Sequence, residues 1–215
     1  MNNNKKVYVV GGGIYNDYVN WILPLGFEIT DKLEECSLVW ACGGEDWHWS
    51  WYHKGENAPH PALGCNIDRD NQEMKILEKA IKLEIPIGST CRGCQILPVL
   101  AGDCGKIVQH QNNPSGCHKF KTYDGLELNC TSSHHNSAYP YYLDKESYVL
   151  LGWSENLLKY RYLDSVNQDL NSPETEVVFY PKIRALGFQM HWEWDLQNKE
   201  GIKWAQETLI KFLKV

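Results

Sequence analysis

The chain has 215 residues, of which 43% are hydrophobic and 22% charged, a composition typical of one soluble globular domain with a full core. A formal net charge of −6 argues against non-specific nucleic-acid binding, which needs a basic surface. No stretch approaches the roughly 20 apolar residues of a membrane helix, and the start, residues 1–6, is not typical of a signal peptide. We therefore expect a cytoplasmic protein with no nucleic-acid and no membrane partner.

The first half of the chain alternates short apolar strands with helices. The predicted elements are strand 7–10, a short helix 15–24, strands 27–30 and 37–42, helix 70–84, strand 85–88 and a helix from about 93 to 101. Residues 103–147 are expected to be short strands and loops, followed by strands 148–151, 176–180 and 185–189 and a final amphipathic helix. This order predicts one α/β domain over 1–215, with a largely parallel sheet and an antiparallel extension.

Cys91 follows the apolar strand directly, in the run Gly88-Ser89-Thr90-Cys91-Arg92-Gly93-Cys94-Gln95. A strand, a sharp turn and a helix form a nucleophile elbow, which lifts one side chain clear of the sheet. We expect Cys91 to be exposed, to face the helix N-terminus and to be more acidic than a free thiol. Arg92 offers a positive neighbour that could favour the thiolate.

Two other interpretations of this cysteine stay open. Cys91 and Cys94 are spaced as a Cys-x-x-Cys redox pair. A zinc site could use ligands drawn from Cys91, Cys94, Cys104, Cys117 and His118, although no second Cys-x-x-Cys exists. Without a secretory signal, the eight cysteines are expected to be mostly free thiols.

A candidate general base follows near the C-terminus, in Gly187-Phe188-Gln189-Met190-His191-Trp192-Glu193. In an extended segment, residues two apart point to the same side, so Glu193 can fix the tautomer of His191. Together with Cys91, these residues predict a Cys-His-Glu triad.

Two glycine-rich segments follow predicted strands. Gly43-Gly44-Glu45-Asp46 could present backbone N–H groups that, with the N–H of Arg92, stabilise an oxyanion. The run at 11–13 lacks the G-x-G-x-x-G spacing of a dinucleotide site. Trp47, Trp49 and Trp51 alternate along a loop and could line a pocket.

Five motifs in order resemble the class I glutamine amidotransferase superfamily, and within it the γ-glutamyl hydrolase-like branch, peptidase family C26. They are Gly43-Gly44-Glu45-Asp46, Asp68-Arg69-Asp70, Thr90-Cys91-Arg92-Gly93-Cys94-Gln95, Ser133-His134-His135-Asn136 and Gly187-Phe188-Gln189-Met190-His191-Trp192-Glu193. The resemblance implies a flavodoxin-like three-layer fold. The chain departs from the family pattern at Ser89 (for Gly), Trp192 (for Pro) and Asn136 (for Gln).

The resemblance also implies the roles of the site residues. Cys91, His191 and Glu193 would be catalytic, and the N–H groups of Gly44 and Arg92 would form the oxyanion hole. The substrate-binding residues would be Gly43, Gln95, His134 and His135.

The expected activity is hydrolysis of glutamine or a γ-glutamyl amide through a γ-glutamyl thioester, without metal or organic cofactor. The chain would act as a glutaminase subunit beside a separate synthetase or ligase, or as a stand-alone γ-glutamyl hydrolase. The alternatives are a non-catalytic binding or regulatory protein on the same fold and a Cys91/Cys94 redox protein.

Overall fold

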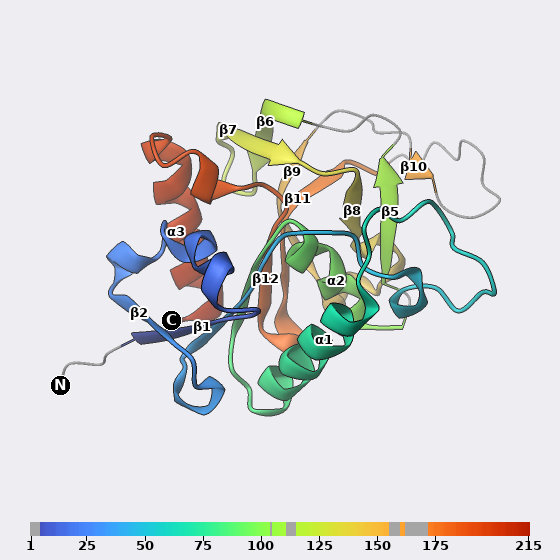
Figure 1. Cartoon of the computed structure of the whole chain (residues 1–215). Helices are drawn as coiled ribbons and strands as arrows, with labels where there is room; N and C mark the ends of the chain where they lie inside the picture. The colour runs from blue at the N-terminus through green and yellow to red at the C-terminus, as the bar shows by residue number, and fades with distance from the viewer. Residues whose placement is uncertain (1–4, 104, 111–114, 155–159, 162–171) are drawn as a thin grey trace.

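The computed structural model describes residues 5–103, 105–110, 115–154, 160–161 and 172–215 (Figure 1). Cys104, one of the residues considered for zinc, lies outside them. In the described part of the chain, none of the helices combines the length and the apolar character that crossing a membrane would require.

A nine-stranded sheet forms the centre of the fold. Its strand order is β2-β1-β3-β4-β12-β11-β9-β6-β7. The bounds are β1 Lys5–Val9, β2 Phe27–Thr30, β3 Leu38–Ala41, β4 Ile87–Thr90, β6 Ser115–Thr122, β7 Glu127–Ser133, β9 Val149–Ser154, β11 Glu174–Tyr180 and β12 Ala185–Phe188.

The sheet has a parallel half and an antiparallel half. Strands β2, β1, β3, β4 and β12 run parallel to one another, whereas β11, β9, β6 and β7 continue the sheet from β12 through antiparallel pairs. This confirms the predicted α/β class and its antiparallel extension. The carboxyl ends of β3, β4 and β12 meet at one edge, where ligands bind in open parallel sheets.

Apolar side chains lie on both faces of the sheet and form two cores. Helices α1 (Ile67–Lys82) and α2 (Arg92–Ala101) cover one face, and α3 (Lys199–Leu213) packs on the other. Along β3, Leu38 and Trp40 belong to the core under α3, whereas Val39 and Ala41 belong to the core under α1 and α2. Successive side chains of a buried strand thus point to opposite faces of the sheet, and each face is covered by helices. This gives the three layers, helices, sheet and helix, that were expected.

One segment differs from the prediction. The predicted helix 15–24 is two 3₁₀ helices, η1 (Gly13–Val19) and η2 (Leu23–Leu25). Pro24 stands at the start of η2 and Gly26 ends it in a left-handed conformation, so no α-helical ladder can continue. The short strands expected within 103–147 are observed, and two of them, β5 (Lys106–His110) and β8 (Asn136–Tyr139), form a separate three-stranded sheet with β10 (Tyr160–Arg161).

Helix α2 lies very close to β3, and Gly93 makes this approach feasible. A Cβ at position 93 would lie 2.2 Å from the carbonyl oxygen of Ala41, a backbone atom that cannot move aside. The glycine therefore sets how deeply the helix after Cys91 is seated on the sheet.

We expect Gly93→Ala to lower the free energy of unfolding by about 1–3 kcal/mol, as overpacking does in a close-packed core. Gly102→Ala, at the end of the same helix, is the matched control, because its Cβ would meet only the end of the Leu143 side chain, at 3.1 Å. Urea denaturation of both variants measures the difference. Equal stabilities would contradict this account of the helix packing.

Candidate active site

Cys91 lies between β4 and α2, on the turn that the elbow predicts. Its backbone has φ 50° and ψ −111°, a strained conformation for a residue other than glycine. Two hydrogen bonds hold the turn: the N–H of Cys91 donates to the carbonyl of Phe188 at 2.8 Å, and the N–H of Gln95 donates to the carbonyl of Cys91 at 3.1 Å. Only 5% of Cys91 is exposed, so the expectation of an exposed thiol is wrong.

His191 and Glu193 lie beside this turn because β12 pairs in parallel with β4. Phe188 is opposite Thr90 in this register, so the chain after β12 runs next to Cys91. The Nδ1 atom of His191 is 2.6 Å from Oε1 of Glu193, and both side chains are buried. Burial lowers the pKa of His191, but hydrogen bonding and charge interactions with Cys91 and Glu193 outweigh it and raise the pKa to about 9.

Two aromatic residues flank the imidazole of His191. Trp194 stacks on it with ring centroids 3.6 Å apart and planes 2° apart, and the indole remains half-exposed. On another side lies Tyr18, with a centroid separation of 6.1 Å. Burial raises the pKa of the Tyr18 phenol, and the neighbouring Glu193 and Cys91 raise it further. With these rings beside it, His191 is only 3% exposed.

The Gly43–Gly44 pair follows β3, the neighbour of β4 in the sheet. Ala41 is paired with Ser89, so the glycines lie at the same sheet edge as Cys91. Gly44 has φ +137°, which favours glycine, and a Cβ there would lie 2.4 Å from the Arg69 guanidinium.

Arg69, from the Asp68-Arg69-Asp70 motif, holds the glycine loop in place. Its Nη2 donates to the carbonyl oxygen of Gly43 at 2.9 Å. The same guanidinium forms ion pairs with Glu45 and, at 2.6 Å, with Glu73. The loop is therefore fixed to α1 by a charged side chain.

The side chain of Arg92 is buried and does not have the surroundings expected of a group that favours the thiolate of Cys91. Its guanidinium pairs with Asp70 and Glu73 of α1 and lies 3.8 Å from the centre of the Trp47 ring. The indole N–H of Trp47 donates to the carbonyl of Arg92 at 2.9 Å. Arg92 is therefore engaged by two carboxylates and is not available to favour a thiolate at Cys91. Trp47 is core, whereas Trp49 and Trp51 are partly buried.

The polar segment around His134 connects the elbow helix with the glycine loop. Gln95 donates from Nε2 to the carbonyl of Asn136 at 2.8 Å, and the Nδ1 atom of His134 lies 3.0 Å from the same carbonyl. His135 Nε2 lies 2.7 Å from Oδ2 of Asp46, and this hydrogen bond raises the pKa of His135. The residues predicted to bind substrate are therefore brought together with the glycine loop.

The alternative interpretations of the cysteines gain little support. Cys94 is fully buried, and burial raises the pKa of its thiol well above the usual value, which disfavours the thiolate that a redox pair needs. Of the residues considered for zinc, Cys117 is exposed on β6 while the neighbouring His118 is partly buried. His118 instead lies beside Cys130 and Glu176, which sequence analysis did not select.

The glycines at 11–13 line a pocket that is separate from the site around Cys91. It has a volume of about 850 Å³ at the carboxyl ends of β1 and β2, and its lining includes residues 11–13, Asp31, Arg69 and Glu73. The residues Cys91, His191 and Glu193 are not part of its lining.

Sequence analysis missed the roles of Glu73, Tyr18 and Trp194. A signal existed for Glu73, because positions 69 and 73 lie one helical turn apart and a basic and an acidic residue there can pair. Tyr18 and Trp194 reach His191 through the tertiary fold, and no local pattern indicates that contact.

Comparison with known proteins extends this description. The family model of peptidase C26 matches residues 26–141, a range that contains Cys91 and ends before His191. Protein NtpR of Enterococcus hirae is 32% identical over 91 residues, which cover 41% of this chain and 36% of that protein. A glutamine amidotransferase-like protein of Rickettsia prowazekii, RP404, is 31% identical over 91 residues, covering 41% of this chain and 31% of that protein. The matches thus span about a third of the length of these curated relatives.

Solved structures share the fold at low sequence identity. A protein described as a GMP synthase subunit, from Thermoplasma acidophilum, has a TM-score of 0.55 and 17% identity, and the match covers 98% of this chain and all of that one. A glutamine amidotransferase of Thermotoga maritima has a TM-score of 0.55 and 18% identity over 98% of this chain and 89% of its own. Because the family model matches just over half of the residues and the fold agrees, the chain belongs to the peptidase C26 family.

Proposed function

We propose that this protein is a cysteine-dependent hydrolase of C–N amide bonds that acts on glutamine or a γ-glutamyl amide. The observation that carries the proposal is the position of His191, which is hydrogen-bonded to Glu193 through Nδ1 and lies on the segment that the pairing of β12 with β4 brings next to Cys91. A base held between a thiol and an orienting carboxylate is the arrangement that activates a cysteine nucleophile.

In the proposed reaction, the thiol proton of Cys91 passes to His191 and the sulfur attacks the γ-carbonyl carbon. The tetrahedral intermediate collapses as His191 returns the proton to the leaving nitrogen, which departs as ammonia or an amine. Water, deprotonated by His191, then attacks the γ-glutamyl thioester. Glutamate is released and the thiol of Cys91 is restored, with no cofactor in the cycle.

The oxyanion of both intermediates would be stabilised by the backbone N–H groups of Gly44 and Arg92. Two features support this assignment: Gly44 lies at the sheet edge beside the elbow, and Arg92 is the first residue of α2. The contacts of Arg69 with Gly43 and Glu45, and the ion pair of Arg92 with Glu73 of α1, would hold these donors in place before substrate binds, which is the condition for electrostatic stabilisation.

The glutamyl end of the substrate would bind near Gly43, Gln95, His134 and His135. The hydrogen bonds among these segments support a preformed polar site next to Cys91. The released ammonia could pass to a separate synthetase or ligase subunit, or the protein could hydrolyse γ-glutamyl compounds alone. Turnover of a γ-glutamyl conjugate by the isolated chain would favour the second role, and glutaminase activity only with an added synthetase the first.

Replacement of the nucleophile tests the proposal. We expect Cys91→Ala to reduce glutamate release from glutamine or a panel of γ-glutamyl amides by at least about a thousandfold, because the nucleophile acts as a unit with its base. Mass spectrometry of the products measures this. Cys65→Ala is the matched control, since Cys65 is an exposed free cysteine. A Cys91→Ala protein that remains active would contradict the thiol mechanism.

The pH profile tests the role of Glu193. The leaving nitrogen takes its proton from the protonated imidazole of His191, so we expect kcat/KM to fall as pH rises past about 9, the pKa of His191. Glu193 favours the protonated imidazole. Its replacement in Glu193→Gln should therefore lower this pKa and move the alkaline limb to lower pH. An alkaline limb that stays in place in the variant would contradict the assignment.

Trp194 is expected to position His191. An aromatic face against the imidazolium favours its charged form by about 0.5–2 kcal/mol. Trp194→Ala should therefore lower kcat and shift the alkaline limb of the kcat–pH profile to lower pH. In Trp194→Phe, the value of kcat and the position of the alkaline limb should stay closer to those of the wild type. The pH dependence of kcat distinguishes this role from packing alone. If the alkaline limb of Trp194→Ala lies at the same pH as that of the wild type, the stacking does not affect the pKa of His191.

A further inference from the structure

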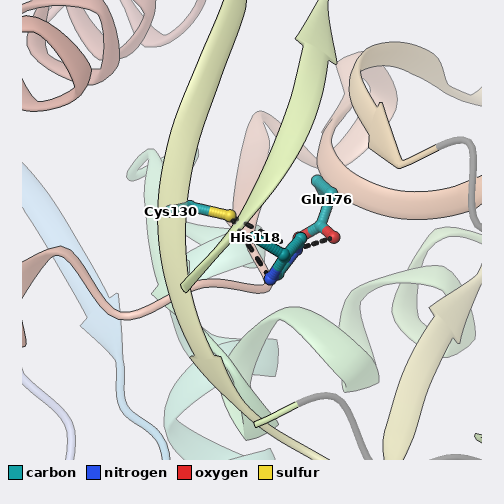
Figure 2. Close-up of side chains that lie close together, drawn as sticks. All are labelled: His118, Cys130 and Glu176. Carbon is teal, nitrogen blue, oxygen red and sulfur yellow. Dashed lines mark hydrogen bonds and ion pairs between the residues drawn. The ribbon is translucent and has the colours of Figure 1, made fainter. Parts of the chain in front are cut away.

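A second Cys-His-Glu cluster lies on the antiparallel half of the sheet, formed by His118 of β6, Cys130 of β7 and Glu176 of β11 (Figure 2). His118 and Cys130 are direct cross-strand partners. Nε2 of His118 is 2.7 Å from Oε1 of Glu176 and 3.3 Å from Sγ of Cys130. Cys130 and Glu176 are fully buried, and 17% of the His118 side chain is exposed.

The geometry of this cluster does not suit a second catalytic triad. A base that relays a proton needs the nucleophile on one ring nitrogen and the carboxylate on the other. Here the sulfur and the carboxylate oxygen both lie nearest to Nε2, and Nδ1 is 3.9 Å from the sulfur. Burial also raises the pKa of the Cys130 thiol, and the nearby Glu176 and Glu174 raise it further.

The three side chains instead bring their possible ligand atoms close together, as the residues of a metal site do. The possible ligand atoms of the three residues all lie within 4.8 Å of one another. Glu176 lies where the pairing of β11 with β9 shifts register between Thr175 and Val177, and such a bulge can redirect a side chain.

We infer that His118, Cys130 and Glu176 bind a borderline divalent cation of the zinc type. One sulfur, one nitrogen and one oxygen donor suit Zn²⁺, whereas Ca²⁺ and Mg²⁺ prefer oxygen ligands alone. A fourth position would be filled by water. Binding would release one proton from Cys130 and one from a protonated His118. The two positive charges of the ion would then replace those of the two released protons.

The position of the cluster suggests what the ion would do. The backbone N–H of Gln189 donates to the carbonyl of Glu176, and that of His191 donates to the carbonyl of Thr131, each at 2.8 Å. Thr131 follows Cys130 directly. An ion bound here would hold β6, β7 and β11 together behind the segment that carries His191, as a structural and not a reacting group.

Cobalt(II) substitution tests this inference on the full-length protein after removal of metals with a chelator. We expect one Co²⁺ per chain, a thiolate-to-cobalt charge-transfer band, and loss of that band when one equivalent of Zn²⁺ is added. Cys130→Ser should abolish the band and weaken zinc binding by more than about a hundredfold, measured by competition with a chromophoric chelator. Circular dichroism shows whether the variant is folded, and Glu176→Gln provides a second variant.

Two controls separate this site from the other thiols. Cys117→Ser removes the exposed cysteine next to His118, and Cys91→Ala removes the proposed nucleophile; both should keep the band. Failure of the folded wild-type protein to bind Co²⁺ or Zn²⁺ stoichiometrically would overturn the inference and leave a proton-mediated His118–Glu176 pair. A band that survives Cys130→Ser, or that disappears with Cys117→Ser or Cys91→Ala, would overturn it as well.

Discussion

The buried guanidinium of Arg92 is the constraint on which the candidate active site depends. It follows Cys91 directly, is 1% exposed and pairs with two carboxylates of α1. A charge removed from water in this way is costly unless both partners are present. The ion pairs therefore fix α1 against the start of α2, and the strained turn at Cys91 persists because its surroundings are held on both sides.

Parallel pairing brings the remaining parts of the site to the same edge. Strand β4 lies between β3 and β12, so the elbow has the glycine loop on one side and the His191 segment on the other. Arg69 extends the α1 network to the glycine loop through the carbonyl of Gly43. Each part is thus oriented by contacts that exist without substrate, which is what preorganised catalysis requires.

Much of this arrangement could be predicted from local pattern. Short apolar runs located β3, β4 and β12, and the helical spacing of Met74 and Leu77 located α1. The prediction was weaker where tertiary packing decides: the short helix expected at 15–24 is two 3₁₀ helices, because Pro24 and Gly26 interrupt it. Cys91 was expected to be exposed, but its side chain is buried in the folded chain.

Side-chain partners far apart in sequence were the hardest to foresee. Nothing near Arg92 indicates that its guanidinium would meet Asp70 and Glu73, about 20 residues earlier. The same holds for Trp194 on His191, where the fold, and not a spacing rule, sets the stacking. In the His118 cluster, Cys130 and Glu176 come from strands whose proximity depends on the sheet order.

The central claim is that Cys91 is a nucleophile poised for a γ-glutamyl carbonyl. The most direct measurement is peptide mapping by mass spectrometry after reaction with a glutamine analogue that carries an electrophilic carbon in place of the amide. The account predicts one adduct per chain, located on Cys91, formed more slowly when glutamine is present and absent in His191→Ala. Labelling spread over the exposed cysteines 65 and 117, with Cys91 unmodified, would contradict it.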